Sequence, residues 1–336
     1  MKELFARLMT RPAVFAEMTA ASLLANILAL ASPLFVIQVL NRYVAHGVDA
    51  TLATLAIGTV IAIALEFGFR QVRLRLATFV NKPFDEGLTH SAFKVLTGAK
   101  SAAADALQPG LRQQIINGAD TVQAAFSAPN VAALFDVPFA MVFVFALFLL
   151  SPTLAVIVLI FLGAVFSIAL LTLSSLRGPT RDMTAAGGRR NALISSAISS
   201  GDTVRAFNAQ NFIRRQWREE TGLFQRLLRA VTGRQGLVQT ISASAQGLMG
   251  VAVITTGAIL VVRGQLDVGG MIGANILAAR GLGPIIKLAQ MGEPFAKARQ
   301  ALSLLQEFSR IPQERTEGSA LGCLTSAPME QISGIA

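Results

Sequence analysis

The chain has 336 residues, of which 53% are hydrophobic and 14% are charged. Soluble domains carry about 25% charged residues, so this composition excludes an ordinary soluble protein and indicates an integral membrane protein. The net charge of +10 would suggest nucleic acid in a soluble protein, but no basic run interleaved with aromatic residues is present. We therefore expect no nucleic-acid partner. The single cysteine, Cys323, excludes a disulfide framework and a cysteine-ligated metal site within one chain.

The first 17 residues form an amphipathic segment. Its apolar side chains Leu4, Phe5, Leu8 and Met9 share one helical face and are surrounded by basic residues. This pattern predicts an N-terminal interfacial helix over residues 1–17, lying on the inner membrane surface. A frayed tail is the alternative.

Six apolar stretches are each close to the length of about 20 residues that a membrane-spanning helix needs. The predicted spans are residues 18–40, 51–69, 134–150, 153–176, 237–262 and 269–290. The third and fourth form one hydrophobic hairpin, with no charged residue between Val137 and Leu176 and a break at Ser151–Pro152. Backbone groups in lipid must be satisfied within their own segment, so we predict an all-α membrane protein with six helical spans.

Polar residues interrupt these spans in a few places. Glu66 lies near the end of the second span, and Arg70 follows four residues later, which favours an intrahelical ion pair at the inner interface. We interpret Asp136 and Pro138 as the N-cap and the early first turn of the third span.

Three further polar residues lie inside the first and sixth spans. They are Asn26, Asn275 and Arg280. Such side chains either line a transport pathway or pair between helices, and the sequence leaves both interpretations open.

Basic residues are distributed unevenly between the loops. The long segments Arg70–Lys100 and Arg177–Arg234 are rich in arginine, whereas the short loops Asn41–Ala50 and Arg263–Val268 carry one arginine each and the Ser151–Pro152 turn carries none. By the positive-inside rule, the long segments and both termini are cytoplasmic and the short turns are outside. The protein therefore holds long helical extensions on the cytoplasmic side of the membrane.

The segment after Pro83 has its own amphipathic pattern. Apolar side chains recur at helical spacing in Phe84, Leu88, Ala92 and Val95. This pattern predicts a short separate helix in the cytoplasm. At the other end of the chain, residues 293–308 are amphipathic, and residues 309–336 read as a polar tail.

Four stretches resemble the transmembrane domain of ABC exporters, specifically the type I protein-secretion branch. They read LALASPLFVIQVLNRYVAHGVDATL, ALFDVPF, SGDTVRAFNAQ and GGMIGANILAARGLGPI. The resemblance covers about Phe15 to Gln306; ALFDVPF and the last stretch are the most specific, whereas TVRAF occurs across ABC exporters generally. It implies a homodimer or heterodimer of six-helix halves, with two short coupling helices resting on nucleotide-binding domains.

The resemblance also assigns these coupling helices to positions in this chain. The first falls near residues 84–96 and the second near residues 201–207. The implied contact residues are Phe84, Leu88, Val95, Gly201, Asp202, Thr203, Arg205 and Phe207. The alternative is that these segments are ordinary helix ends and turns.

A full member of that family continues into an ATPase domain. Such a domain needs a GxxxxGK[ST] loop to cradle phosphates, and the 336 residues contain no such loop. We therefore expect no catalytic residue, metal site or cofactor on this chain, with ATP and Mg²⁺ bound by a partner nucleotide-binding domain. The expectation leaves open a separately encoded subunit or a truncated product. We also expect no peptidase-like domain before the first span.

The implied function is permease-mediated export across the bacterial inner membrane. The resemblance implies an unfolded polypeptide substrate with a C-terminal signal, a periplasmic adaptor and an outer-membrane channel. One alternative is an ABC half-exporter for lipid or small molecules, and another is a non-transporting remnant or membrane scaffold. A membrane enzyme is disfavoured because the sequence shows no paired carboxylates at a recognisable spacing and no metal motif.

Overall fold

The structure is a computed structural model that describes residues 11–44, 49–100, 109–175 and 177–309. Long helices build the described part of the chain. In order they are α2 (Pro12–Leu28), α3 (Ala31–Gln38), the π-helix η1 (Val39–Tyr43), α5 (Asp49–Gly98), α7 (Pro109–Ala125), α8 (Ala128–Leu150), α9 (Pro152–Ser175), α10 (Arg177–Ser199), α11 (Gly201–Ala206), α12 (Gln210–Val262), α13 (Val268–Gln290) and α14 (Gly292–Ser309). The predicted all-α fold is confirmed.

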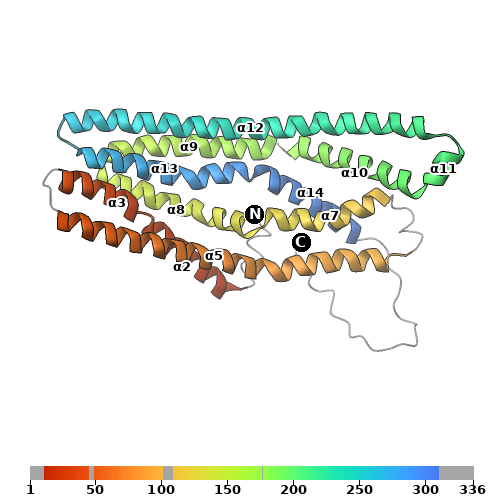
Figure 1. The fold of residues 1–336 in the computed structure, drawn as a ribbon, viewed down its shortest axis with the longest axis horizontal. Coiled ribbons are helices and arrows are strands. Elements are labelled where there is room, and N and C mark those ends of the chain that lie inside the picture. The colour runs from red at the N-terminus through yellow and green to blue at the C-terminus, as the bar shows by residue number, and fades with distance from the viewer. Residues whose placement is uncertain (1–10, 45–48, 101–108, 176, 310–336) are drawn as a thin grey trace.

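The helices form one elongated bundle whose two ends differ (Figure 1). At one end, Ser151 joins α8 to α9 and residues 263–267 join α12 to α13. We call this the short-turn end. At the opposite end, α11 joins α10 to α12, and we call this the α11 end. The 53 residues of α12 span about 80 Å, more than twice the roughly 30 Å of a bilayer core, so a large part of α12 must extend beyond the membrane.

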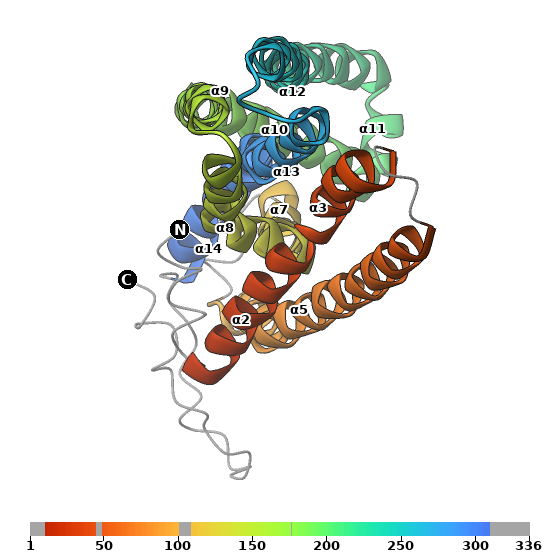
Figure 2. The ribbon, with the colours of Figure 1, turned by 90° about the vertical axis from the view of Figure 1, so that its left-hand side faces the viewer.

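Helix α13 occupies the centre of the short-turn half. Seen from that end, α2, α3 and α5 lie on one side of α13, and α9 and α12 lie on the other (Figure 2). The main hydrophobic core joins α8, α9, α12 and α13 through side chains such as Phe143, Leu147, Leu154, Val253 and Leu282, which are at most 3% exposed. Ala29, at the end of α2, is buried in the same core, whereas Met18 of α2 packs with Ala77 and Val80 of α5 in a second cluster.

Outward-facing apolar side chains match a lipid environment. Five described helical stretches are long and apolar enough to cross a membrane: Pro12–Tyr43, Asp49–Gly98, Ala128–Leu150, Gln210–Val262 and Val268–Ser309. A shorter apolar stretch covers Pro152–Ile168. Val60, Phe67 and Leu149 are all at least 65% exposed on the protein surface, which suits side chains that face lipid rather than water.

Helix α5 corrects one expectation. The predicted separate helix over residues 84–96 is wrong as an independent element, because α5 continues through Pro83 to Gly98. Proline removes the backbone N–H that would bond to the carbonyl of Phe79. Packing on both sides of the proline holds the helix together, since Val80 before it and Val95 after it are buried.

Helix α8 corrects a second expectation. The helix begins at Ala128, so Asp136 and Pro138 lie in its interior and are not its N-cap and first turn. Asp136 is tolerated there because it is buried against a cation, as described below. Pro138 lies on the exposed face of α8.

The two ends of the chain extend beyond the described residues. Of the predicted interfacial helix over residues 1–17, the first ten residues lie outside the described ranges. Residues 12–17 form the first turns of α2 and continue without a break into the span, so that part is no separate helix. Ser309 is the last residue of α14, and the rest of the predicted polar tail, residues 310–336, is also outside the described ranges.

Candidate functional site

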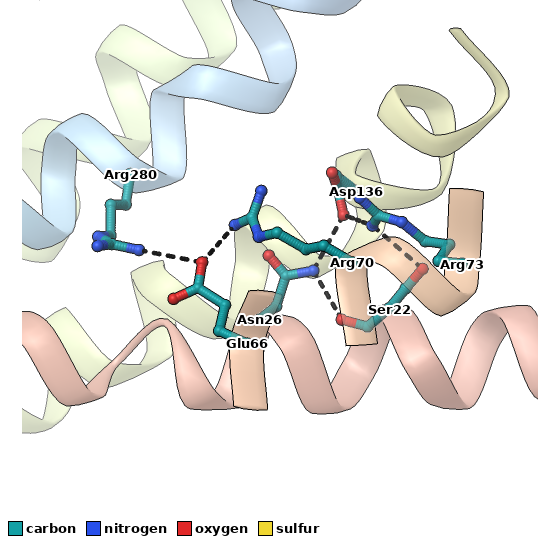
Figure 3. Close-up of polar contacts among 7 residues, drawn as sticks. All are labelled: Ser22, Asn26, Glu66, Arg70, Arg73, Asp136 and Arg280. Carbon is teal, nitrogen blue, oxygen red and sulfur yellow. Dashed lines mark hydrogen bonds and ion pairs between the residues drawn. The ribbon is translucent and has the colours of Figure 1, made fainter. Parts of the chain in front are cut away.

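A buried polar network joins α2, α5 and α8 (Figure 3). Asp136 on α8 forms an ion pair with Arg73 on α5 and accepts a hydrogen bond from Asn26 Nδ2 at 3.1 Å. Arg73 also donates to Ser22 Oγ at 3.3 Å, and Asn26 Nδ2 lies 2.8 Å from the carbonyl oxygen of Ser22. None of these four residues is more than 8% exposed. Three helices thus meet at one carboxylate.

Helical spacing explains how the network assembles. Ser22 and Asn26 are four residues apart, so both lie on the face of α2 that meets α5 and α8. On α8, Ala132 and Ala140 lie one turn before and one turn after Asp136, and both are buried. Small side chains let neighbouring helices approach closely, so the arginine and asparagine can reach the carboxylate.

The depth of the network makes the pairing necessary. Asp136 is about 22 Å along α8 from Ser151 at the short-turn end, within the roughly 30 Å of a bilayer core. A lone charge at such a depth is expensive, so membrane proteins pair it with an opposite charge or face it to a cavity. Arg73 supplies the opposite charge, and Asn26 supplies a neutral donor.

A second polar cluster links α5 to α13 (Figure 3). The predicted ion pair is present: Arg70 lies 2.8 Å from Glu66 on the same helix. Arg280 on α13 lies 3.8 Å from the same Glu66 oxygen. The side chain of Glu66 is 13% exposed, whereas those of Arg70 and Arg280 are 41% and 31% exposed. One carboxylate therefore lies between two partly exposed cations.

The three polar residues that the sequence left open have different surroundings. Asn26 and Arg280 both bond across helices, to Asp136 and Glu66 respectively. Asn275 lies on α13 and faces α12, where a Cβ added to Gly250 would be 3.4 Å from its Oδ1. Two of the three residues thus pair between helices in this state.

The second predicted coupling segment, residues 201–207, forms helix α11 and the residue that follows it. Gly201 to Ala206 form a short helix at the far end of the bundle, and Phe207 follows it (Figure 1). Asp202, Thr203 and Arg205 are exposed, and Phe207 is 79% exposed. The Arg205 and Asp202 side chains lie 3.6 Å apart. An exposed apolar and charged surface therefore stands at the tip of two long helices.

The turn after α11 has a clear local cause. Asn208 adopts a positive φ of 48°, a left-handed conformation that asparagine tolerates better than most residues. The backbone N–H of Asn208 donates to the Arg205 carbonyl at 3.1 Å, and that of Ala209 donates to the Val204 carbonyl at 2.9 Å. These bonds end α11 and direct the chain into α12.

The first predicted coupling segment is different. Val95 is 7% exposed and packs with Ile115, Leu305 and Phe308, and Leu88 is partly buried against the same cluster. Phe84 is half-buried in α5. Leu88 and Val95 therefore contribute to the internal packing of α5 with α7 and α14, and the assignment of this segment as a coupling helix stays a prediction. The connection between α5 and α7, residues 101–108, is outside the described ranges.

Sequence reasoning missed Ser22 and Arg73 as members of the network. A signal for Arg73 was available, because an aspartate in an apolar helix requires a cation and α5 carries several arginines at the right depth.

In the described ranges, no group of three His, Cys, Asp or Glu side chains could hold a metal ion.

Comparison with known proteins identifies the family and the fold of this chain. The family described as the ABC transporter transmembrane region matches residues 15–283, which is most of the chain. The chain belongs to this family. A solved structure titled as a bacterial Atm1-family ABC exporter with ATP bound is similar with a TM-score of 0.70 at 16% identity, over 88% of this chain and 53% of that one. The fold is therefore the transmembrane fold of ABC exporters.

Curated relatives cover the same region of this ABC transporter chain. The type I secretion system ATP-binding protein PrsD of Rhizobium meliloti is 25% identical over 299 residues, which is 88% of this chain and 50% of the relative. The cyclolysin secretion/processing protein CyaB of Bordetella pertussis (strain Tohama I) is 25% identical over 301 residues, 90% of this chain and 42% of the relative. The alpha-hemolysin translocation protein HlyB of Escherichia coli O157:H7 is 22% identical over 310 residues, which is 91% of this chain and 43% of the relative. The chain spans half or less of their length.

Proposed function

We propose that this chain is the permease part of a type I protein-secretion exporter in the bacterial inner membrane. ATP and Mg²⁺ bind to a nucleotide-binding domain at the α11 end, and ATP hydrolysis there drives the helices of the bundle. A second transmembrane half completes the pathway. The substrate is an unfolded polypeptide, passed to a periplasmic adaptor and an outer-membrane channel.

The observation that carries this proposal is the position of α11. The ATPase chemistry of an ABC transporter takes place in water, so its motion must reach the membrane through helices that extend from it. Helix α11 lies at the tip of α10 and α12, with Phe207 79% exposed and Asp202 and Arg205 exposed beside it. Such an apolar and charged surface suits docking on another domain.

Orientation follows from charge. The α10–α12 segment contains many arginines, among them Arg214, Arg215, Arg218, Arg226 and Arg229, and all five side chains are exposed. Few basic residues lie at the short-turn end. The positive-inside rule therefore supports a cytoplasmic α11 end and an external short-turn end.

The secretion branch is supported by the relatives. The three compared above carry names that describe secretion or translocation, and two of those names specify a cyclolysin and an alpha-hemolysin. Their similarity extends over 88–91% of this chain. A polypeptide substrate for this chain is the corresponding inference.

Copurification with an ATPase tests the coupling part of the proposal. The tagged full chain is purified from membranes of its own host in mild detergent, and vanadate-sensitive ATP hydrolysis is measured. We expect a copurifying protein with a GxxxxGK[ST] loop, and we expect Phe207→Ala to lose most of that ATPase. Phe67→Ala is the matched control, because Phe67 is also exposed, at 70%, but lies in the apolar part of α5. Equal ATPase in both variants would contradict docking at α11.

A secretion assay tests the substrate. Deletion of the gene is expected to remove one or a few proteins from the culture medium, and the wild-type chain is expected to restore them while Phe207→Ala does not. An unchanged set of secreted proteins with altered membrane lipids would support a lipid or small-molecule half-exporter instead. Absence of any associated ATPase would support a membrane scaffold.

A further inference from the structure

The α3–η1 segment closes against the start of α13 at the short-turn end (Figure 2). Asn41 Nδ2 donates to Asp267 Oδ2 at 3.2 Å, and the backbone N–H of Gly269 donates to Asn41 Oδ1 at 3.1 Å. Asp267 occupies the N-cap position of α13 but makes no side-chain cap bond. Asn41 therefore satisfies a first-turn N–H of α13 that its own N-cap residue leaves open. We call this contact, with Ile37 and Gly273, the α3–α13 seam.

Two glycines of α13, Gly269 and Gly273, allow the two helices to approach closely at the α3–α13 seam. A Cβ added to Gly269 would lie 2.4 Å from Asn41 Oδ1 and 2.7 Å from the backbone oxygen of Ile37. A Cβ added to Gly273, one turn later, would lie 2.3 Å from Ile37 Cγ1. The backbone of α13 thus contacts α3 directly, a packing that only small residues allow. By contrast, a Cβ on Gly283 of the same helix would meet nothing within 4 Å.

Asn41 lies in the middle of the π-helix η1, which covers Val39–Tyr43. π-helical turns are rare, contain one extra residue compared with an α-helical turn, and occur often at functional sites. A return to α-helical winding would rotate the residues that follow by about 100° relative to those before, because successive residues are that far apart around the axis. Such a change would move Asn41 away from α13.

The seam and the buried network tie the same side of the bundle in different ways. Asp267 is exposed and Asn41 half-buried, so water can replace the Asn41 bonds when the seam opens. Asp136 and Arg73 are at most 8% exposed, so breaking their ion pair would leave buried charges without a partner, which is costly. Separation of α2, α3 and α5 from α13 should therefore begin at the short-turn end.

We propose that the α3–α13 seam is a latch that holds the external end of the bundle closed. On opening, η1 and α3 move off α13 while the Arg73–Asp136 network stays intact, so that the α2–α3–α5 side pivots about that network. Which compartment the latch faces rests on the proposed membrane orientation. Its test measures distances in the chain and does not depend on transport, so it can fail or succeed independently of the secretion proposal.

Spin-label distances test the latch. Labels are placed at Val44→Cys, beside η1, and Val262→Cys, at the end of α12, because these side chains are 68% and 88% exposed. The background is Cys323→Ser, and the full chain is reconstituted in lipid nanodiscs with excess unlabelled protein. Gly269→Ala is expected to shift the main distance to a longer value. Gly283→Ala, the matched control on the same helix, is expected to leave it unchanged.

A milder variant protects the test against misfolding. Asn41→Asp places a second carboxylate opposite Asp267 and is expected to raise the ratio of long to short distances about two- to tenfold, the range set by one net hydrogen bond. The double variant Asn41→Asp/Asp267→Asn restores an amide opposite a carboxylate and is expected to return the ratio to that of the parent. The latch is refuted if Gly269→Ala matches Gly283→Ala, or if the double variant resembles Asn41→Asp. The pivot is refuted if Asp136→Asn alone gives the same lengthening as Asn41→Asp.

Discussion

Removal of the Asp136 carboxylate should strongly destabilise this bundle. In Asp136→Ala, the Arg73 guanidinium stays buried at 4% exposure and keeps only the 3.3 Å hydrogen bond to Ser22 Oγ. Breaking a buried ion pair by deleting one partner costs about 3–5 kcal/mol, because the remaining charge is left uncompensated. We expect a loss of free energy of unfolding in this range.

The same reasoning predicts that removing both charges is less harmful than removing one. In Arg73→Met/Asp136→Leu, apolar side chains of similar size replace the pair, and such replacements are often neutral or stabilising. Asn26 Nδ2 keeps its 2.8 Å contact with the Ser22 carbonyl in this variant. We therefore expect the double variant to recover most of the stability that Asp136→Ala loses.

Thermal unfolding of the purified chain in detergent, followed by circular dichroism, measures both effects. The apparent midpoint of Asp136→Ala is expected to fall by on the order of 10 °C, using the scaling of soluble domains. Asp202→Ala is the matched control, because that carboxylate is fully exposed on α11. The reasoning is refuted if Asp136→Ala behaves like Asp202→Ala, or if the double variant is as unstable as the single one.

Three further outcomes follow from the described contacts. Glu66→Gln should lower stability by less than about 1 kcal/mol, because Arg70 and Arg280 are 41% and 31% exposed and water can solvate them; a melting shift as large as that of the buried pair would contradict this. Pro83→Ala should stabilise α5 by restoring a helical N–H, seen as a higher melting midpoint, and a lower midpoint would mean that the proline is needed for packing. Phe207→Ala should change the free energy of unfolding by no more than about 0.5 kcal/mol because its side chain is 79% exposed, and a clear loss of stability would show that it packs on its own chain.

Apolar length and short polar breaks in the sequence define most of the helical framework. The predicted span 153–176 differs from α9 by one residue at each end, and the predicted span 269–290 differs from α13 by one residue at its start, because Ser151–Pro152 and the Arg263–Asp267 loop interrupt otherwise continuous apolar stretches. The second coupling segment, predicted over residues 201–207, coincides with α11 and the residue after it.

Local signals failed where tertiary contacts compensate for them. Asp136 followed closely by Pro138 is a typical helix start, yet α8 begins eight residues earlier, because an arginine from a distant part of the chain neutralises that aspartate. Pro83 is a typical helix end, yet α5 continues through it. Partner choice within the network also depends on how α2, α5 and α8 pack, which no local pattern encodes.

The length of α12 has a mechanical consequence. The helix is continuous over 53 residues from the α11 turn to the short-turn end, with no proline inside it. A rod of about 80 Å that tilts by about 5° around one end moves its other end by about 7 Å, larger than one helical turn. Small tilts of α12 at the α11 end would thus be amplified into larger displacements at the short-turn end. Helix α12 therefore acts as a lever: for a given tilt, the displacement of its far end is proportional to the number of residues in the helix.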